Sequence, residues 1–296
     1  MAGPATVTYR YVGRELSDAD LEMIRAICTD PSYPTRAAIA RECCRALGWV
    51  GADGRLKDMS AKVALARMDA DGLICLPPPT AKVTRPFRHL EATITPGPDI
   101  ACSLRELKEI EIAVVKRATD ASATWNEMIS RFHYLGYTPA SGAQLRYLVM
   151  TAGGAPIAAI SFAASAWALE DRDNYISWST EQRKARLHLV VGNPRFLVAP
   201  WVHVPHLASH LLGTITRRLQ DDWQARYSYK PVLIETFVEV GRHRGTCYQA
   251  ANWIRVGRTK GRGKLDRYNN YALPVKDIYL YPLVRNFRRQ LTAPLG

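Results

Sequence analysis

The stretch from Pro231 to Lys264 constrains the fold most strongly, because strand-like, helix-like and basic segments follow one another in it without a break. Residues 232–238 are rich in β-branched and aromatic side chains, which predicts a buried strand. Residues 245–252 consist mainly of small residues and predict a short helix, and residues 253–257 alternate as a half-buried strand does. The stretch therefore predicts part of a sheet, followed by a basic segment.

Two carboxylates, Glu235 and Glu239, interrupt the predicted buried strand. An unpaired buried carboxylate costs several kcal/mol and tends to take up a proton, so Glu235 is expected to have either a partner or a chemical role. One hypothesis pairs it with an arginine such as Arg255 on the neighbouring strand. The other makes it a catalytic base or a metal ligand.

The positive charge is concentrated near the C-terminus. The net charge is +13, and residues 241–296 hold twelve Lys or Arg against two Asp or Glu. This imbalance predicts an anionic partner, with nucleic acid first (DNA before RNA) and a phosphorylated cofactor second; a basic surface that serves only solubility is the alternative. The predicted nucleic-acid contacts are Lys57, Lys62, Arg67, Arg242, Arg244, Arg255, Arg258, Lys260, Arg262, Lys264 and Arg267.

Cysteine usage and hydropathy predict the compartment. The six cysteines form no C-x-x-C pair, which indicates a reducing environment. The longest apolar stretch, Leu187 to Val204, is broken by Asn193, Pro194 and Arg195, so no membrane span is expected. The sequence thus predicts a cytoplasmic protein without a membrane partner.

The first 90 residues predict a winged helix-turn-helix module. In that fold the third helix enters the major groove and a basic wing contacts the backbone, and here the wing would carry Lys82, Arg85 and Arg88. Met59, Val63 and Ala66 are expected to face inward from the third helix. A module that only docks onto another protein is the alternative. The predicted helices lie at residues 17–28, 35–47 and 58–70, and a strand at 73–76.

A proline-rich linker, residues 91–103, precedes a second predicted domain at residues 104–296. Its long helix should begin at Pro205 and carry an apolar stripe that ends near Trp223. The other predicted elements are a strand near 110–114, a helix at 121–132, a hairpin of 144–150 with 157–162, and strands at 185–191 and 196–201.

This order of elements resembles the GNAT acetyltransferase fold over about residues 104–260. The resemblance implies an α/β (α+β) chain in which a GNAT-like mixed sheet with flanking helices follows the winged-helix-like module. It also implies acetyl-CoA as cofactor, Glu235 as general base and Tyr248 as general acid. The sequence departs from that family at residues 202–209, where no glycine stands in the position of the family's phosphate-binding loop.

Over most of its length the chain also looks like the DruA proteins of the Druantia anti-phage systems. The segments that carry this resemblance include residues 13–17, 54–59, 76–79, 193–197, 207–209, 222–223, 235–238, 245–248, 251–253 and 257–263. It implies a role in phage defence or mobile-element biology. It also implies that some relatives are transposase-like and that other proteins of the defence system are partners.

Further side chains are candidates for metal binding or catalysis. His206 and His210 are one helical turn apart, but no complete set of metal ligands is predicted. Asp171, Asp173, Asp222, Glu235 and Glu239 could hold Mg²⁺ in a DNA-processing enzyme. The candidate catalytic residues are Glu235, Tyr248, Cys247, Asp222 and His206. Three functions remain open: a non-catalytic DNA-binding protein, an acetyl-CoA-dependent acyltransferase, and a metal-dependent nuclease or transposase-like enzyme.

Overall fold

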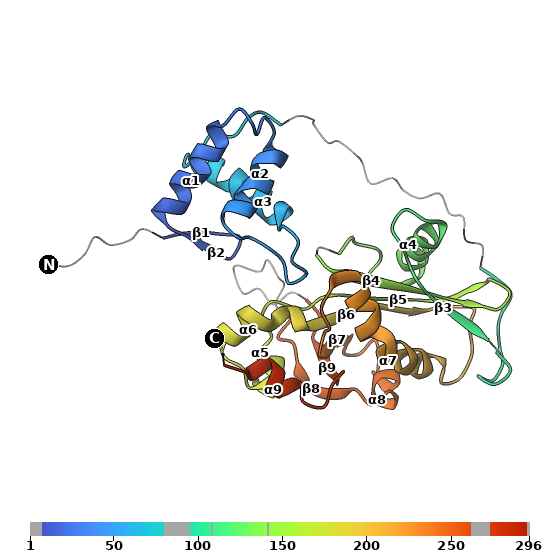
Figure 1. The fold of residues 1–296 in the computed structure, drawn as a ribbon. Coiled ribbons are helices and arrows are strands. Elements are labelled where there is room, and N and C mark those ends of the chain that lie inside the picture. The colour runs from blue at the N-terminus through green and yellow to red at the C-terminus, as the bar shows by residue number, and fades with distance from the viewer. Residues whose placement is uncertain are drawn as a thin grey trace. The chain divides into compact units, whose positions relative to one another are not determined.

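A computed structural model describes residues 8–79, 94, 96–107, 109–140, 142–261 and 273–294. The chain divides into an N-terminal unit, Met1–Arg88, and a C-terminal unit, His89–Gly296 (Figure 1). Each unit has a core of its own, and the two are described separately below. None of the helices in the described ranges is long and apolar enough to cross a membrane.

The described part of the N-terminal unit, residues 8–79, contains a short hairpin and three helices. The hairpin pairs β1 (Tyr9–Tyr11) with β2 (Arg14–Leu16), and the helices are α1 (Asp18–Thr29), α2 (Arg36–Ala46) and α3 (Asp58–Ala70). Ser17 and Asp20 form a capping box at the start of α1, because each side chain accepts a hydrogen bond from the other's backbone N–H. The three helices therefore form where the sequence predicts them.

The buried face of α3 differs from the prediction. Met59 is 64% exposed and Val63 43% exposed, whereas Ala61 and Ala64 are fully buried. Leu65 and Met68 complete the buried face. Both sets of positions fit a helical period, but alanines at the contact let α3 approach its neighbours closely, and the larger side chains then face outward.

The strand predicted at residues 73–76 does not form. Its backbone groups bind side chains instead: Leu76 N–H donates to Asp69 (3.0 Å), and Leu73 C=O accepts from Arg25 (2.8 Å). The predicted wing residues Lys82, Arg85 and Arg88 lie outside the described residues. In this unit the described hairpin precedes the helices, and the strand expected after the third helix is absent from residues 71–79.

The C-terminal unit is built on one mixed sheet with strand order β3-β4-β5-β6-β7-β9-β8 (Figure 1). Among these described strands β6 and β7 run parallel, and the other neighbouring pairs are antiparallel. The strands are β3 (Ile110–Val114), β4 (Gln144–Thr151), β5 (Pro156–Ala164), β6 (Val190–Val198), β7 (Leu233–Glu239), β8 (Ile254–Arg258) and β9 (Lys276–Pro282).

Helices α4 (Asp120–Phe132) and α7 (Leu207–Tyr227) cover opposite faces of this sheet. Arg146 and Tyr147 are adjacent in β4, so their side chains point to opposite faces. Arg146 donates to Asn126 of α4 (2.7 Å), and the Tyr147 hydroxyl donates to Asp222 of α7 (2.9 Å). The remaining helices are α5 (Glu170–Ile176), α6 (Thr180–Arg186), the 3₁₀ turn η1 (Leu187–Leu189), α8 (Thr246–Ala250) and α9 (Phe287–Thr292).

Several predicted elements of this unit need correction. Two strands are expected at 185–191 and 196–201, but residues 185–189 belong to α6 and to a 3₁₀ turn, and a single strand, β6, runs from Val190 to Val198. Helix α7 begins at Leu207 rather than at Pro205. No helix is predicted around Asp171 and Asp173, but both residues belong to α5. No strand is predicted after residue 257, because the C-terminal part of the chain is interpreted from its basic charge, but β9 lies between β7 and β8.

Candidate functional site: a basic cleft between two strands

The parallel strands β6 and β7 separate halfway along their length. They pair from Val190 with Leu233 as far as Asn193 with Thr236, although β6 continues to Val198 and β7 to Glu239. The next residue of β6 is Pro194, which has no backbone N–H and so cannot extend a ladder of hydrogen bonds. The sequence thus opens the sheet at this point.

A cleft of about 510 Å³ lies in the opening. Its walls combine aromatic and basic side chains, and no Asp or Glu is among the residues that line it. The lining comes from the end of α4, from β6 and β7 where they separate, from the turn before α8 and the first residues of α8, and from β9: residues 132–135, 193–198, 236–238, 243–248 and Lys276.

The polar groups at the floor of the cleft bind one another. The Tyr248 hydroxyl donates to Asn193 Oδ1 (2.8 Å), and Asn193 Nδ2 donates to the Ser161 carbonyl oxygen (2.8 Å). Thr236 Oγ1 donates to the Asn193 carbonyl oxygen (3.0 Å). Burial raises the pKa of Tyr248 well above its usual range, so the phenol stays protonated at neutral pH.

A group of stacked rings forms part of the rim. The Tyr134 ring stacks on His133 (centroids 4.9 Å apart), meets His243 edge-on (5.4 Å) and has the Arg242 guanidinium over it (4.7 Å). Burial, with the charges of Arg195 and His243, lowers the pKa of His133 to about 4. Its ring is therefore neutral at pH 7.

Three cations in the cleft lack an acidic partner. Arg195 is half-buried and donates to the carbonyl oxygen of Gly136 (3.0 Å), Arg244 is exposed, and Lys276 is half-buried. Among the residues that the structure describes, no ion pair joins any of the three to a carboxylate. An anion that enters the cleft would meet uncompensated positive charge.

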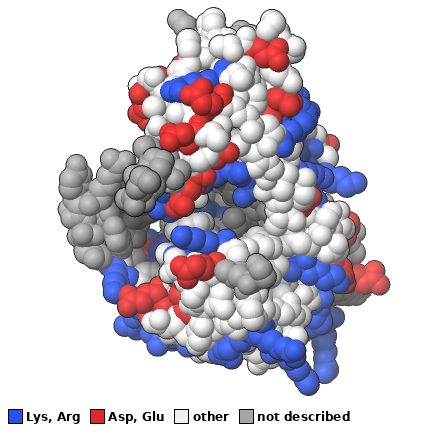
Figure 2. All heavy atoms as spheres, turned by 60° about the vertical axis from the view of Figure 1, so that its left-hand side comes forward, with Lys and Arg blue, Asp and Glu red and all other residues white. Residues whose placement is uncertain are grey.

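A second basic surface lies on the edge strand β8. Arg255 and Arg258 both bind Asp277 (2.7 Å each), so two guanidinium groups share one carboxylate. Hydrogen bonds from Arg255 and then from Arg258 lower the pKa of Asp277, which stays ionised. Figure 2 looks from the side on which α6 and α9 lie in Figure 1, and basic side chains extend along the lower edge of that view.

The other predicted nucleic-acid contacts are scattered. Lys260 pairs with Glu170 (2.6 Å), and Arg242, at the rim of the cleft, pairs with Glu239 (3.2 Å). In the N-terminal unit Lys62 pairs with Asp58 (3.3 Å), while Lys57 and Arg67 are exposed. Arg262, Lys264 and Arg267 lie outside the described residues.

Gly257 has a structural role that the sequence reasoning did not find. A Cβ atom on Gly257 would lie 1.8 Å from Asp171 Oδ2, and that carboxylate accepts the backbone N–H of Arg258 (2.7 Å). Asp171 therefore caps the open edge of β8, and only glycine leaves room for it. The glycine at this position thus permits a close contact between α5 and β8.

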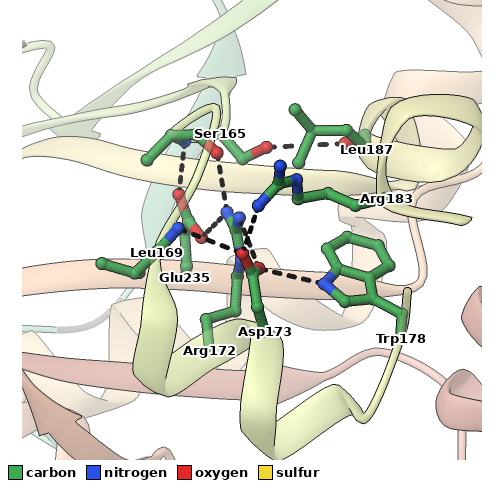
Figure 3. A network of polar contacts seen from close by, with 9 residues as sticks. Ser165, Leu169, Arg172, Asp173, Trp178, Arg183, Leu187 and Glu235 are labelled. Atoms are coloured by element: carbon green, nitrogen blue, oxygen red, sulfur yellow. Dashed lines mark hydrogen bonds and ion pairs between the residues drawn. The ribbon is translucent and has the colours of Figure 1, made fainter. Parts of the chain in front are cut away.

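Glu235 is a buried ion-pair partner, and its partner is Arg172. The two side chains are fully buried, with Arg172 Nη1 at 2.7 Å from Glu235 Oε2, and Ala166 N–H donates to Oε1 at 2.6 Å (Figure 3). The predicted partner, Arg255, is exposed and binds Asp277 instead. Glu235 is not among the residues that line the cleft.

The Glu235 pair is part of a larger network that joins β7 to α5 and α6. Asp173 binds Arg172 (2.8 Å) and Arg183 (2.9 Å) and accepts a hydrogen bond from the Trp178 indole N–H (3.0 Å), as Figure 3 shows. Burial raises the pKa of Glu235 against the opposing charge of Arg172. Burial acts the same way on Asp173, but Arg172, Arg183 and Trp178 outweigh it and lower the pKa of that carboxyl.

The remaining catalytic candidates lie in different places. Asp222 binds Arg218 (2.7 Å) and Tyr147 on the α7 side of the sheet, and His206 is an exposed residue that precedes α7. Cys247 and Tyr248 both line the cleft. Burial raises the pKa of Cys247, which keeps it a thiol at neutral pH. The structure thus brings two of the five candidates together.

The sequence reasoning missed the residues that shape the cleft, above all Asn193, Pro194, Arg195, His133 and Tyr134. The sequence does contain a signal for the opening of the sheet. A proline inside an apolar run, here in Asn-Pro, marks a point where a strand cannot continue its hydrogen bonds to a neighbouring strand. The rim residues gave no such signal, since they follow the end of a helix far away in the sequence.

The residues present do not fit the pyrophosphate of acetyl-CoA at the place where the GNAT resemblance puts it. In the loop before α7, Trp201 and Val204 are buried, Pro205 has no N–H, and the N–H groups of Val202 and His203 already bind the carbonyl oxygens of Ala199 and Ile100. The donors that remain are backbone N–H groups at the start of α7, such as those of Ala208 and Ser209, and no glycine is present to let phosphate oxygens come close to the backbone. Among the described residues, no group of three His, Cys, Asp or Glu is arranged to hold a metal ion.

Comparison with known proteins gives one family and one fold likeness. The family model described as "Druantia protein DruA" matches residues 82–272, more than half of the chain. No protein with a curated description matches. Among solved structures, a spermidine N-acetyltransferase from Vibrio cholerae is 12% identical (TM-score 0.36) and covers 59% of this chain and 94% of its own. A putative phosphinothricin N-acetyltransferase is 11% identical (TM-score 0.40), with 60% and 99% covered.

Proposed function

Since the chain belongs to the DruA family, whose model is that of a Druantia protein, we propose that it is a nucleic-acid-binding protein of phage defence. Its C-terminal unit would supply the main contacts, with DNA preferred to RNA. The single observation that carries this proposal is the excess of basic side chains after residue 240, which leaves cations on β8, on α9 and in the cleft without equal numbers of acids.

The edge strand β8 supports the proposal by its geometry. The Arg255 and Arg258 side chains are 43% and 55% exposed, and their one shared carboxylate balances only one of the two charges. Phosphate groups of nucleic acid can bind such guanidinium groups bidentately and release condensed counterions. Three further exposed arginines, Arg285, Arg288 and Arg289, lie at or just before α9.

The N-terminal unit is proposed to assist through α3, as the predicted winged-helix-like module would. Lys57 and Arg67 are exposed at the two ends of this helix, where they can contact phosphates. Met59 and Val63 are exposed between them, and such apolar side chains can contact thymine methyl groups. The same exposed apolar residues also suit docking to another defence protein, which is the alternative for this unit.

A salt titration tests the proposal. Each phosphate contact to duplex DNA contributes about 0.9 to the slope of log affinity against log salt, so Arg255→Ala/Arg258→Ala should lower the slope by about 1.8. The matched control is Arg217→Ala/Lys230→Ala, which removes two exposed cations, one on α7 and one in the loop between α7 and β7. Equal slopes for wild type and the β8 variant would refute the assigned contacts, and no binding by wild type would refute the function.

An acyltransferase activity is the second candidate. It is favoured by the position of Tyr248 and Cys247 in a cleft between parallel strands that separate, in a unit where β7, α8 and β8 follow the long helix α7 as predicted. Because the loop before α7 does not fit the cofactor's pyrophosphate, no catalytic step is derived for it. Calorimetric titration with acetyl-CoA separates the two candidates, since a specific heat of binding would support the second.

A further inference from the structure

We propose that the cleft between β6 and β7 holds one unpaired nucleotide of a single-stranded nucleic acid, with a phosphate at Arg244 and Lys276 and the base at the Tyr134 rim. This inference rests on the proposed function and specifies it, because it states which form of nucleic acid the C-terminal unit recognises and where. Three observations lead to it: the charge of the lining, the shape of the cleft and the state of its polar groups.

The charge of the lining selects an anion. Arg195, Arg244 and Lys276 contribute three positive charges, and the lining contains no carboxylate to offset them. Cations of like sign inside a concave site repel one another, and the low dielectric of the walls strengthens that repulsion. A bound phosphate would relieve it, so the site is electrostatically suited to a phosphorylated ligand.

The shape of the cleft selects a single strand over a duplex. Its volume of about 510 Å³ is that of a site for one small molecule or one nucleotide. A duplex presents its phosphates on a convex surface and keeps its bases stacked inside, so it cannot reach a half-buried cation such as Arg195. A single strand can turn one nucleotide out of its stack and insert it.

The polar groups of the cleft suit recognition without base specificity. The side chains of Asn193, Thr236 and Tyr248 at the floor already bind one another or nearby backbone groups, so they offer few directed hydrogen bonds to a base edge. Tyr134 is 38% exposed at the rim, in contact with His133 and Arg242. A base of any type can add to such a group of rings, because every base has a flat π-face.

The experiment compares two probes by fluorescence anisotropy: an oligomer of about ten thymidines, within the roughly 4–16 nucleotides typical of such sites, and a blunt duplex of about twenty base pairs. For Arg244→Ala/Lys276→Ala we expect at least tenfold weaker binding of the oligomer and a salt slope lower by about 1.4, from two single-strand contacts at about 0.7 each. Binding of the duplex should change less than threefold.

Two further variants test the position of the base. Tyr134→Ala should weaken oligomer binding roughly fivefold or more, the range that loss of one stacked base produces, whereas Tyr134→Phe should retain it because the ring is kept. An equal effect of the alanine and phenylalanine variants would contradict stacking. Arg217→Ala/Lys230→Ala serves again as the charge-matched control and should leave oligomer binding within twofold.

The outcomes separate this inference from the proposed function. If Arg255→Ala/Arg258→Ala weakens the binding of both probes and the cleft variant weakens neither, the proposed function stands and the cleft inference falls. If the cleft variant weakens both probes equally, the cleft is not selective for single strands and the inference also falls. Selective loss of the oligomer in the cleft variant, with unchanged melting of the protein, supports it.

Discussion

The ion pair between Glu235 and Arg172 gives the sharpest test of how this fold is held together. Both side chains are fully buried, and Arg172 also binds Asp173. Replacing one partner of a buried pair leaves the other charge without compensation, at about 3–5 kcal/mol. We therefore expect Arg172→Met to lower the free energy of unfolding of the C-terminal unit by that amount, or the melting temperature by roughly 6–20 °C.

The two single variants should differ. In Glu235→Gln the guanidinium keeps Asp173, so the expected loss is that of a charge-assisted hydrogen bond, about 1.5–3 kcal/mol. The double variant Glu235→Gln/Arg172→Met should be less destabilised than the two losses added together, because no buried charge is left unpaired in it. Differential scanning calorimetry at pH 7 measures all four proteins.

The pH dependence provides an independent check. In Arg172→Met burial would raise the pKa of Glu235 further above its unfolded value of about 4.3, because the opposing charge is gone. A carboxyl with a raised folded pKa favours the folded state more as the pH falls towards that unfolded value. The difference in stability between Arg172→Met and wild type should therefore be smaller at pH 5 than at pH 7.

The outcome also decides the role of Glu235. Additive losses below about 1 kcal/mol each, similar to those for the exposed Lys230–Asp221 pair tested by Lys230→Met, would refute the structural role. If Glu235→Gln instead kept its stability and lost a transfer or DNA-processing activity of the wild type, the catalytic hypothesis from the sequence would return.

Two further predictions concern β8 and the rim. Gly257→Ala should lower the stability of the C-terminal unit by about 1–3 kcal/mol in a denaturant titration, because its Cβ would overlap Asp171; Asp171→Ala in the same chain should recover part of the loss, and no loss at all would contradict the close contact. His133, whose folded pKa of about 4 lies below the unfolded value, should contribute stability that is present above about pH 6.5 and lost as the pH falls towards 4. Because the ring is partly exposed, we expect about 1–2 kcal/mol; His133→Asn should remove this pH dependence of stability, and an unchanged pH profile would count against it.

Local signals in the sequence predicted the local structure well. The predicted helices at 17–28 and 35–47 begin at Ser17 and Thr35, and in the structure these two side chains are the N-caps of α1 and α2. The apolar stripe that ends at Trp223 identified the long helix α7, because apolar residues that recur every three or four positions over such a length form one face of a helix. Caps and stripes depend on residues a few positions apart, which a sequence displays directly.

Contacts between distant segments were much harder to predict. The buried carboxylate at position 235 indicated a partner, but choosing Arg172 over Arg255 requires the knowledge that α5 folds over β7. Strand β9 was missed although Ile278 and Leu280 alternate with tyrosines, because the surrounding charge dominated the interpretation of that segment. The buried face of α3 was predicted wrongly because two sets of positions repeat with a helical period. The prediction chose the set with Met59 and Val63, whereas the set with Ala61 and Ala64 is buried.

The candidate site shows the same division. Tyr248 and Cys247 were predicted and lie in the cleft, whereas the cations Arg195 and Lys276 come from strands that the sequence reasoning did not connect. Whether the site is catalytic was left open, and the geometry favours binding because its polar floor is internally satisfied.

Pro194 has a consequence for the thermodynamics of any ligand of the cleft. The strands are held apart by the absence of one hydrogen-bond donor, so no ladder must be broken before a molecule enters. A ligand therefore binds a state that is already populated, without the loss of affinity that follows when the competent conformation is rare. Because the opening depends on backbone chemistry, the rim residues on α4, β9 and the turn before α8 can be exchanged for others while the entrance stays open.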